Sequence, residues 1–124
     1  MSNCDKVRRF IRAWEARDID AICAAVSEDV FYHNIPMEPV TGREAVRQFG
    51  APFLAGADKV IWDLHFIAET PDGAVLTERT DHFHMKDGNT ISVRVMGTFE
   101  FNEDGLISKW RDYFDLAEFQ SQSS

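Results

Sequence analysis

Hydrophobic residues in the first part of the chain recur with the spacing of amphipathic helices. Apolar side chains at i, i+3, i+4 and i+7 form one helix face, because an α-helix turns once in about 3.6 residues. These positions are Val7, Phe10, Ile11 and Trp14 in the first segment and Ile19, Ile22, Cys23 and Val26 in the second. Asp18 is positioned to cap the second helix. Residues 41–44 form a capping-box pattern, which predicts a third helix running through Val46 and Phe49.

The later part of the chain has the pattern of strands separated by tight turns. Apolar and polar residues alternate from about residue 59 to residue 115, and three Asp-Gly pairs interrupt the alternation. The pairs are Asp72-Gly73, Asp87-Gly88 and Asp104-Gly105. Asp-Gly between alternating runs is a strong hairpin signal, so the sequence predicts a four-stranded meander. Trp62, Leu64 and Phe66 share one apolar face of its first strand. A shorter strand is predicted over residues 30–35.

Helices followed by a twisted antiparallel sheet are typical of an α+β domain. We expect a strongly curved, mostly antiparallel sheet with the N-terminal helices packed on its concave face. The open end of such a sheet encloses one deep apolar pocket, which is a common position for a small-molecule site. The length fits a single domain over residues 1–124. Its polar end, from about residue 120 to residue 124, is expected to be a disordered tail.

Composition and charge exclude several classes of function. Hydrophobic residues make up 44% of the chain, as in folded globular proteins. A net charge of −8 disfavours binding to nucleic acid or to an anionic membrane, since both require a basic surface. No apolar run has the length of a membrane span or of a signal-peptide core. The two cysteines, Cys4 and Cys23, do not make a disulfide framework. We therefore expect a cytoplasmic protein in which Cys23 is a small core residue.

Three charged residues are the strongest candidates for chemistry. Arg79 and Asp81 are two residues apart on a predicted strand, so their side chains point to the same face. Asp112 lies on the last predicted strand. If this face is buried, the two acids cannot both ionise easily, and a carboxylic acid would lie beside a carboxylate as general acid and general base. Arg79 would orient both acids through hydrogen bonds. The alternative is a structural salt bridge without a catalytic role.

Tyr32 and Asn34 form a second candidate pair, again two residues apart on a predicted strand. A hydroxyl and an amide beside a carboxylate could hold a water molecule with one lone pair free to attack. The alternative is a packed tyrosine and an asparagine that completes a turn. The four histidines lack metal-ligand spacing, and the chain has no phosphate-binding loop or nucleophile elbow. No metal or cofactor is therefore predicted.

Convergence of the acids depends on the strand between them, at about residues 90–101. A shift of one residue in its register would move each side chain to the opposite face. We expect Val93, Val95 and Phe99 to face the interior, and the alternative is Arg94 and Met96. The acids converge if the two Asp-Gly turns that flank this strand differ in loop length.

The order of the polar candidates resembles that of the limonene-1,2-epoxide hydrolase family. The matching positions are Tyr32-x-Asn34, Arg79-x-Asp81 and Asp112 within Trp-Arg-Asp-Tyr-Phe-Asp. Further similar segments are Ile35-Pro36-Met37, Gly42-Arg43-Glu44-Ala45, Leu76-Thr77-Glu78-Arg79 and Met96-Gly97-Thr98-Phe99-Glu100. The resemblance extends from the first helix to about Phe114. The wider superfamily includes ketosteroid isomerases, polyketide cyclases and nuclear transport factor 2, and it has a cone-shaped α+β fold.

This resemblance implies a cofactor-independent epoxide hydrolase. Such an enzyme adds water to a hydrophobic epoxide in one concerted acid/base step and releases a vicinal diol. By resemblance, Asp112 is the base that deprotonates the water, and Tyr32 and Asn34 position that water. Asp81 is then the acid that protonates the epoxide oxygen, and Arg79 bridges the two acids. The family also implies a homodimer formed through the outer face of the sheet.

The rest of the pocket is expected to be apolar and to bind the substrate. The expected substrate-binding residues, from strand parity or from proximity to Asn34, are Ile35, Met37, Phe83, Trp110 and Phe114. Two other functions stay open at this point. One is an isomerase or cyclase of the same superfamily that uses a carboxylate for proton transfer. The other is a non-enzymatic dimer that binds a small ligand and uses the charged trio as a structural network.

Overall fold

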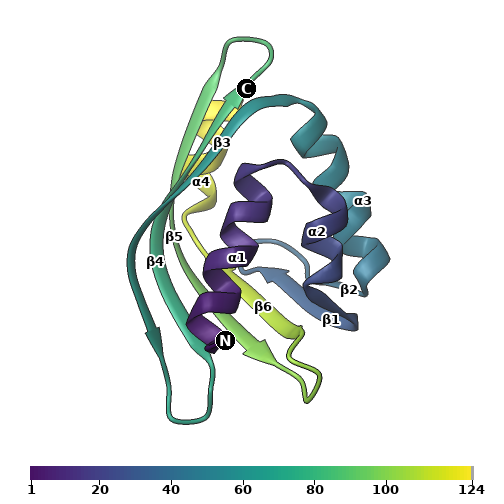
Figure 1. Cartoon of the computed structure of the whole chain (residues 1–124). Helices are drawn as coiled ribbons and strands as arrows, with labels where there is room; N and C mark the ends of the chain where they lie inside the picture. Colours follow the sequence, from purple (N-terminus) through teal and green to yellow (C-terminus); the bar gives the residue numbers. More distant parts are fainter. Residues whose placement is uncertain (124) are drawn as a thin grey trace.

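A computed structural model describes residues 1–123 of the chain and has the expected α+β architecture. The helices are α1 (Asn3–Glu15), α2 (Ile19–Ala24), α3 (Arg43–Ala55) and α4 (Leu116–Ser123). The strands are β1 (Val26–Asn34), β2 (Val40–Thr41), β3 (Ala57–Glu69), β4 (Val75–Met85), β5 (Thr90–Phe101) and β6 (Ile107–Tyr113). Figure 1 shows α1, α2 and α3 on the concave side of a curved sheet, as the sequence predicted.

The six strands form one mixed sheet in the order β2-β1-β6-β5-β4-β3. The predicted meander is confirmed, because β3, β4, β5 and β6 pair in antiparallel fashion one after another. The strand predicted over residues 30–35 is part of the longer β1, which pairs in parallel with β6. This pairing joins the first half of the chain to its last strand, so residues near position 32 lie beside residues near position 110.

The helical periodicity of the sequence identifies the buried face of α1. Its buried residues are Val7, Phe10, Ile11 and Trp14. The Ser2 hydroxyl caps this helix by accepting a hydrogen bond from the N–H of Asp5. Asp18 caps α2 as predicted, accepting from the N–H of Ala21 at 3.1 Å. The predicted apolar series of α2 ran to Val26, but the helix ends at Ala24 and Val26 is the first residue of β1.

The capping box predicted at residues 41–44 is wrong. Thr41 ends β2, where it pairs with Phe31 of β1. The N-cap of α3 is Gly42, and no side chain makes a hydrogen bond at this cap. Gly42 has a φ of 104°, a conformation that glycine adopts without the steric cost of a Cβ. Thr41, which the sequence pattern assigned to the helix cap, is therefore part of the β1–β2 pairing instead.

One predicted strand face is also wrong, because β3 contains a β-bulge. Leu64 pairs with Arg79, but Phe66 pairs with Glu78, so His65 is an additional residue on β3. The bulge moves Phe66 to the outer face of the sheet, where it is 71% exposed. Strict alternation from Leu64 had assigned it to the inner face.

The strand between the candidate acids has the expected register. Its two flanking turns differ in length, with loops at residues 86–89 and residues 102–106. The buried side chains of β5 include Val93, Val95 and Phe99, and the exposed ones include Arg94 and Met96. The glycines of the two turns, Gly88 and Gly105, have positive φ angles, which is what a tight Asp-Gly turn requires. The inner face of β5 therefore has the parity that the sequence favoured.

An aromatic cluster around Trp110 forms the centre of the core. Trp110 is fully buried, and its ring stacks on Tyr32 with ring centroids 4.0 Å apart. Phe10 of α1 meets the same indole edge-on at 5.0 Å, and Phe99 of β5 stacks at 5.9 Å. These contacts join α1, β1, β5 and β6, and aromatic pairs in these geometries stabilise a core beyond the area that they bury.

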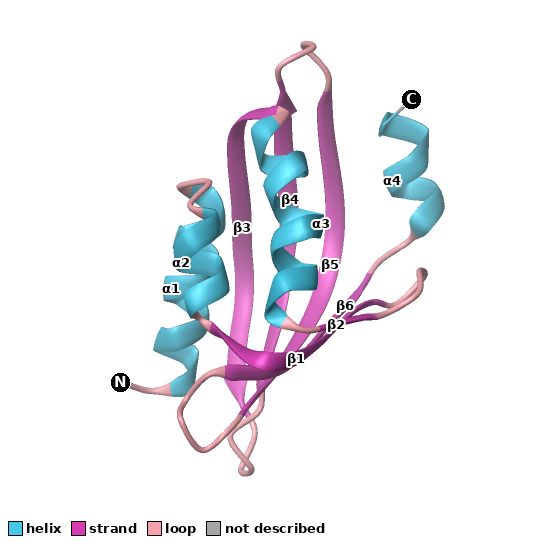
Figure 2. Ribbon diagram, turned by 90° about the vertical axis from the view of Figure 1, so that its right-hand side faces the viewer, coloured by secondary structure: helices cyan, strands magenta, loops and turns pink. Residues whose placement is uncertain are grey.

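The end of the chain is a helix, so the predicted disordered tail is wrong for residues 120–123; Ser124 lies outside the described residues. Figure 2 shows α4 apart from the other helices and next to β5. The side-chain amide of Gln122 donates to the carbonyl of Ser92 at 2.8 Å and accepts from its N–H at 2.9 Å. Ser92 lies in a part of β5 that does not pair with β6, so the Gln122 amide bonds to backbone groups that would otherwise lack a partner on that side. These two hydrogen bonds hold α4 against β5.

Two further expectations concern the cysteines and the membrane. Cys23 is buried, Cys4 is half-buried, and neither forms a disulfide. Burial raises the pKa of the Cys23 thiol, as expected for a core residue. Within residues 1–123, no helix combines the length and the apolar character required to cross a membrane.

The first prediction tests the register of β5 and β6. Phe99→Ala removes a fully buried ring from the aromatic cluster, so the free energy of unfolding should fall by about 3–5 kcal/mol. Lys109→Ala, an exposed position on the neighbouring strand, should change it by less than about 0.5 kcal/mol. Urea denaturation of both variants measures the difference. Equal effects of the two substitutions would contradict this register.

Candidate active site

The register of the sheet brings residues from four strands into one row on the inner face. Thr77 of β4 is opposite Gly97 of β5, Gly97 is opposite Asp112 of β6, and Asp112 is opposite Asn34 of β1. The adjacent row places Tyr32 beside Trp110 in the same way. The sequence pattern predicted that the candidate residues within each strand point to the same side. The strand pairing shows that this side is the inner face of the sheet for β1, β4 and β6 alike.

Arg79 of β4 lies between the two candidate acids. Its Nε donates to Asp81 Oδ1 at 2.8 Å, and its Nη2 donates to Asp81 Oδ2 at 3.2 Å. The same Nη2 donates to Asp112 Oδ2 at 2.8 Å. The guanidinium therefore holds Asp81 in a bidentate pair and Asp112 through a single bond, which gives the two carboxylates a defined spacing.

Neighbouring groups hold this ion network in one arrangement. The remaining guanidinium nitrogen, Arg79 Nη1, donates to the hydroxyl of Thr77 at 3.2 Å. The indole ring of Trp62 covers the guanidinium, with Arg79 Cζ 4.2 Å from the ring centroid. Trp110 donates from its indole N–H to Asp112 Oδ1 at 2.9 Å. Arg79 and Asp112 thus each have a polar or aromatic partner besides their ionic ones, whereas Asp81 is bonded to Arg79 through both carboxylate oxygens.

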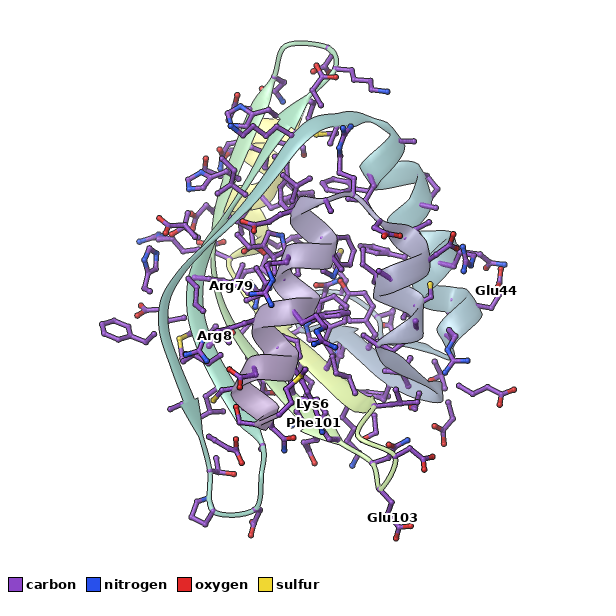
Figure 3. All side chains as sticks on the ribbon, in the orientation of Figure 1. Lys6, Arg8, Glu44, Arg79, Phe101 and Glu103 are labelled. Carbon is purple, nitrogen blue, oxygen red and sulfur yellow. The ribbon has the colours of Figure 1, made fainter. Side chains whose placement is uncertain are left out.

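The network is almost completely withdrawn from solvent. Arg79 is 0% exposed, and Asp81 and Asp112 are each 5% exposed. Figure 3 shows Arg79 pointing from the sheet into the space between the strands and α1. Two carboxylates around one guanidinium carry a net charge of −1 when both are ionised, which is unfavourable in such a site. Protonation of one acid makes the trio neutral.

The pKa shifts follow from this burial. Desolvation raises the pKa of Asp81 to about 6, against the lowering effect of the Arg79 charge and its hydrogen bonds. The negative charge of Asp112 adds to the rise. For Arg79, burial alone would lower the pKa, but the Asp112 and Asp81 carboxylates hold it above its ordinary value. With a pKa of about 6, Asp81 can carry a proton at mildly acidic pH beside an arginine that stays charged.

Tyr32 and Asn34 form a hydrogen-bonded pair beside Asp112. The Asn34 amide donates from Nδ2 to the hydroxyl oxygen of Tyr32 at 2.9 Å. Burial, with the charge of Asp112, raises the pKa of Tyr32 far above its ordinary value, so the hydroxyl keeps its proton. With its oxygen accepting from Asn34, that hydroxyl is a donor toward other groups, and Asn34 Oδ1 remains an acceptor.

An apolar cavity of about 260 Å³ lies over these polar groups. Its polar lining residues are Tyr32, Asn34, Asp81 and Asp112. Its remaining lining consists of Trp14, Met37, Phe49, Phe53, Trp62, Phe83, Val93, Val95, Phe114 and Phe119. Arg79 is absent from the lining, but its partners Asp81, Asp112 and Trp62 are all part of it. A salt bridge with a purely structural role does not need a cavity over its carboxylates, so this arrangement favours a site.

The predicted pocket residues divide into two groups. Met37, Phe83 and Phe114 are in the lining, as expected. Ile35 and Trp110 are not, and this corrects the expectation for both. Trp110 is fully buried in the core behind Tyr32, where it contacts the site by stacking on Tyr32 and by donating a hydrogen bond to Asp112. Strand parity placed it on the correct face but could not show that another ring covers it.

Several lining residues were not predicted from the sequence. Phe49 and Phe53 come from α3, where their i, i+4 spacing puts them on one helix face. Phe119 comes from α4, in a segment for which the sequence predicted no structure. The spacing on α3 was a usable signal, whereas the position of α4 depends on its contacts with β5. In residues 1–123, no cluster of three or more His, Cys, Asp and Glu side chains has the arrangement of a metal site.

Comparisons with known proteins agree on the kind of fold and on the chemistry of related proteins. The model of the SnoaL-like domain family matches residues 7–110. Epoxide hydrolase EphG of Mycobacterium tuberculosis is 32% identical over 111 residues, which cover 89% of this chain and 71% of EphG. The structure of an LEH-like epoxide hydrolase from M. tuberculosis superposes with a TM-score of 0.82 at 28% identity, covering 97% of this chain and 87% of that one.

A second similar structure belongs to an enzyme with a different described role. SalBIII is described as an epoxide hydrolase/cyclase-like enzyme in pyran ring formation in the polyether salinomycin. Its structure superposes with a TM-score of 0.83 at 16% identity, covering 94% of this chain and 92% of that one. At this identity the likeness concerns the fold alone, so the chemistry of the present site has to be argued from its own residues.

The second prediction concerns the pH dependence of stability. Because the folded state raises the pKa of Asp81 from 3.8 to about 6, Asp81 favours folding most at low pH, and this contribution is lost as the pH rises from about 4 to about 6. The comparison is with Asp81→Asn, which does not titrate. The free energy of unfolding of the wild type minus that of the variant should decrease over this interval and level off above it. Denaturation at several pH values measures this difference; a difference that increases with pH would contradict the burial of Asp81.

Proposed function

The chain belongs to the SnoaL-like domain family, and from its site we propose that it is a cofactor-independent epoxide hydrolase that converts a hydrophobic epoxide into a vicinal diol. Its recognised resemblance to limonene-1,2-epoxide hydrolases agrees with the similarity to EphG. The observation that carries the proposal is the bridge from one buried guanidinium to two carboxylates at the floor of an apolar cavity. We propose that residues 1–124 act as a single cone-shaped domain. A cytoplasmic location stays a prediction.

In the proposed mechanism, Asp112, Asn34 and Tyr32 hold the attacking water. The water donates one hydrogen to Asp112 and the other to Asn34 Oδ1, and it accepts a hydrogen bond from the Tyr32 hydroxyl. One lone pair of its oxygen is then free to attack the epoxide carbon. The hydrogen bond from Asn34 to Tyr32 supports these roles. It uses the Asn34 amide N–H and a lone pair of the Tyr32 oxygen, so Asn34 Oδ1 remains free to accept and the Tyr32 hydroxyl proton remains free to be donated.

Asp81 supplies the proton for the leaving oxygen. As the water oxygen forms its bond to carbon, Asp112 takes a proton from the water, the strained carbon–oxygen bond breaks, and Asp81 protonates the epoxide oxygen. The raised pKa of Asp81, about 6, supports its assignment as the acid. After the step Asp112 is protonated and Asp81 is ionised, so a proton must return before the next turnover. Arg79 stays charged throughout and stabilises whichever carboxylate is ionised.

The proposed substrate is apolar apart from its epoxide. The polar lining residues are those proposed to hold the water and to transfer protons. The other lining residues are aromatic or aliphatic, and they include Phe49, Phe53, Phe83, Phe114 and Phe119. Such a wall selects by size and shape. Because one methylene changes discrimination by only about 1–3 kcal/mol, we propose a class of lipophilic epoxides rather than one compound.

We also propose a homodimer formed through the outer face of the sheet. The strand register aligns Phe66, Glu78, Met96 and Tyr113 in one row across β3, β4, β5 and β6. Phe66 is 71% exposed, Met96 49% and Tyr113 44%. Three of the four side chains in this row are largely apolar and exposed, with Glu78 between Phe66 and Met96, and such a row on an open sheet face favours association with another surface. The resemblance to the family points to a second copy of the chain.

The third prediction tests the catalytic assignment. Asp81→Asn and Asp112→Asn should each lower kcat for a hydrophobic epoxide by about 10²–10⁴-fold, because each removes one proton-transfer group. Asp63→Asn, an exposed carboxylate on β3, is the matched control and should keep the wild-type rate. The substrates are a panel of lipophilic epoxides, and diol formation is measured without added metal or cofactor.

A single turnover in oxygen-18 water distinguishes direct attack from a covalent intermediate. Direct attack places the label in the diol on the first turnover. An unlabelled first diol would indicate an ester between enzyme and substrate and would overturn the one-step mechanism. Near-normal turnover by Asp112→Asn would remove Asp112 as the base.

The fourth prediction concerns the dimer. Phe66 lies at the β3 end of this row and is its most exposed apolar member, so Phe66→Glu, which puts a second carboxylate beside Glu78, should weaken the interface and shift the protein from a dimer mass to a monomer mass. Sedimentation equilibrium at micromolar concentration measures both forms. A wild-type protein that sediments as a monomer under these conditions would contradict the proposal.

A further inference from the structure

Gly97 lies in the middle of β5, between the strand that carries Arg79 and the strand that carries Asp112. It is opposite Thr77 on one side and opposite Asp112 on the other. The Arg79 side chain must therefore cross the inner face of β5 to reach Asp112, because neighbouring strands are about 4.8 Å apart. The point of crossing is the position without a side chain.

The backbone does not require glycine at this position. The glycines with a positive φ are Gly42, Gly73, Gly88 and Gly105, so Gly97 has a conformation open to other residues. Glycine inside a strand costs conformational entropy and leaves no side chain to pack. A glycine that is unfavourable for the strand and unnecessary for its backbone indicates that space is needed above it.

The space at Gly97 is occupied by the ion network itself. A Cβ on this residue would lie within 3.0 Å of Arg79 Nη1, 2.6 Å from Asp112 Oδ1 and 3.1 Å from Thr77 Oγ1. Arg79 is 0% exposed, Thr77 is buried and Asp112 is nearly so, which leaves these groups little room to retreat. Even one methyl group would therefore displace the guanidinium or the carboxylate from their present contact.

Thr77 acts on the same guanidinium from the other strand. Its hydroxyl accepts from Arg79 Nη1 at 3.2 Å and donates to the carbonyl of Gly97 at 3.1 Å. The bond to Gly97 aims the hydroxyl lone pairs at Arg79, and the bare Gly97 backbone leaves the path toward Asp112 open. Together the two residues determine both the height of the guanidinium above the sheet and its rotation.

We propose that Gly97 and Thr77 are positioning residues, which seat the Arg79 guanidinium so that it can bridge Asp81 and Asp112. Neither residue is part of the cavity lining, so both act on the reaction through Arg79 and the carboxylates that it bridges. Their effect on turnover rests on the proposed epoxide hydrolysis. Their effect on Arg79 does not, and it can be measured in the protein without substrate.

The fifth prediction uses Gly97→Ala, with Gly56→Ala as the matched control. The Cβ at Gly56 would be 3.4 Å from the terminal methyl of Met85, an ordinary contact. Gly97→Ala should lower kcat for the epoxide that the wild type hydrolyses by about 10²-fold with little change in KM, because the acids are displaced while the cavity wall stays intact. Gly56→Ala should keep both constants. Circular dichroism checks that both variants are folded.

A second readout reports on Arg79 directly. In the wild type, the buried Nε–H of Arg79 is bonded to Asp81 and should exchange slowly with solvent hydrogen, as followed by nitrogen-15 NMR. Gly97→Ala should shift this signal and accelerate its exchange. If Gly97→Ala does not fold, Thr77→Val replaces it, because this nearly isosteric change removes the hydroxyl and leaves Gly97 bare. It should also shift the Arg79 signal and lower kcat.

The outcomes separate the two proposals. An unchanged Arg79 signal and unchanged kcat in a folded Gly97→Ala variant, or in Thr77→Val when the first does not fold, would overturn the positioning role. A wild-type protein that hydrolyses no epoxide would overturn the proposed function, and the NMR comparison would still decide whether Gly97 and Thr77 seat the guanidinium.

Discussion

A guanidinium shared by two buried carboxylates is the interaction on which the site depends. Arg79 has no exposed surface, and a charge in that position is tolerable only with ionic and hydrogen-bonding partners on several sides. Asp81, Asp112 and Thr77 provide the hydrogen bonds, and the ring of Trp62 covers the remaining face. The same burial desolvates Asp81 and, with a smaller contribution from the Asp112 charge, raises the pKa of Asp81 to about 6, which places a potential acid beside a second carboxylate.

The sheet builds this network by combining short-range and long-range pairing. Arg79 and Asp81 come from one strand, so alternation alone aligns them. Asp112 and Asn34 meet because the last strand pairs in parallel with β1, near the beginning of the chain. The aromatic cluster around Trp110 lies at this junction and supports both sides, because Trp110 packs on Tyr32 and donates to Asp112. Core packing and site geometry are thus properties of the same residues, and a change in one is transmitted to the other.

Helices that pack on the sheet provide part of the cavity wall. Phe49 and Phe53 belong to α3, and Phe119 belongs to α4, which is held to β5 by the amide of Gln122. The polar floor is therefore built on strands, where side chains have neighbours on both sides, whereas the apolar wall is shared between helices and strands, the latter through Trp62, Phe83, Val93 and Val95. This division leaves the reacting groups rigid while the wall determines which substrates fit.

Local periodicity in the sequence determined the helix faces, the Asp-Gly turns, the pairing of Arg79 with Asp81 on one face and the candidate set itself, because these features depend on residues a few positions apart. Tertiary structure alone decided the rest. The bulge at His65 puts Phe66 on the outer face, and Thr41 pairs with β1 instead of capping α3. Packing places Trp110 behind Tyr32 and α4 beside β5. The need for Gly97 was likewise invisible, because it comes from an arginine that crosses from another strand. The bulge, the pairing of distant strands and the crossing contacts are set by residues far apart in the chain, and no local pattern encodes them.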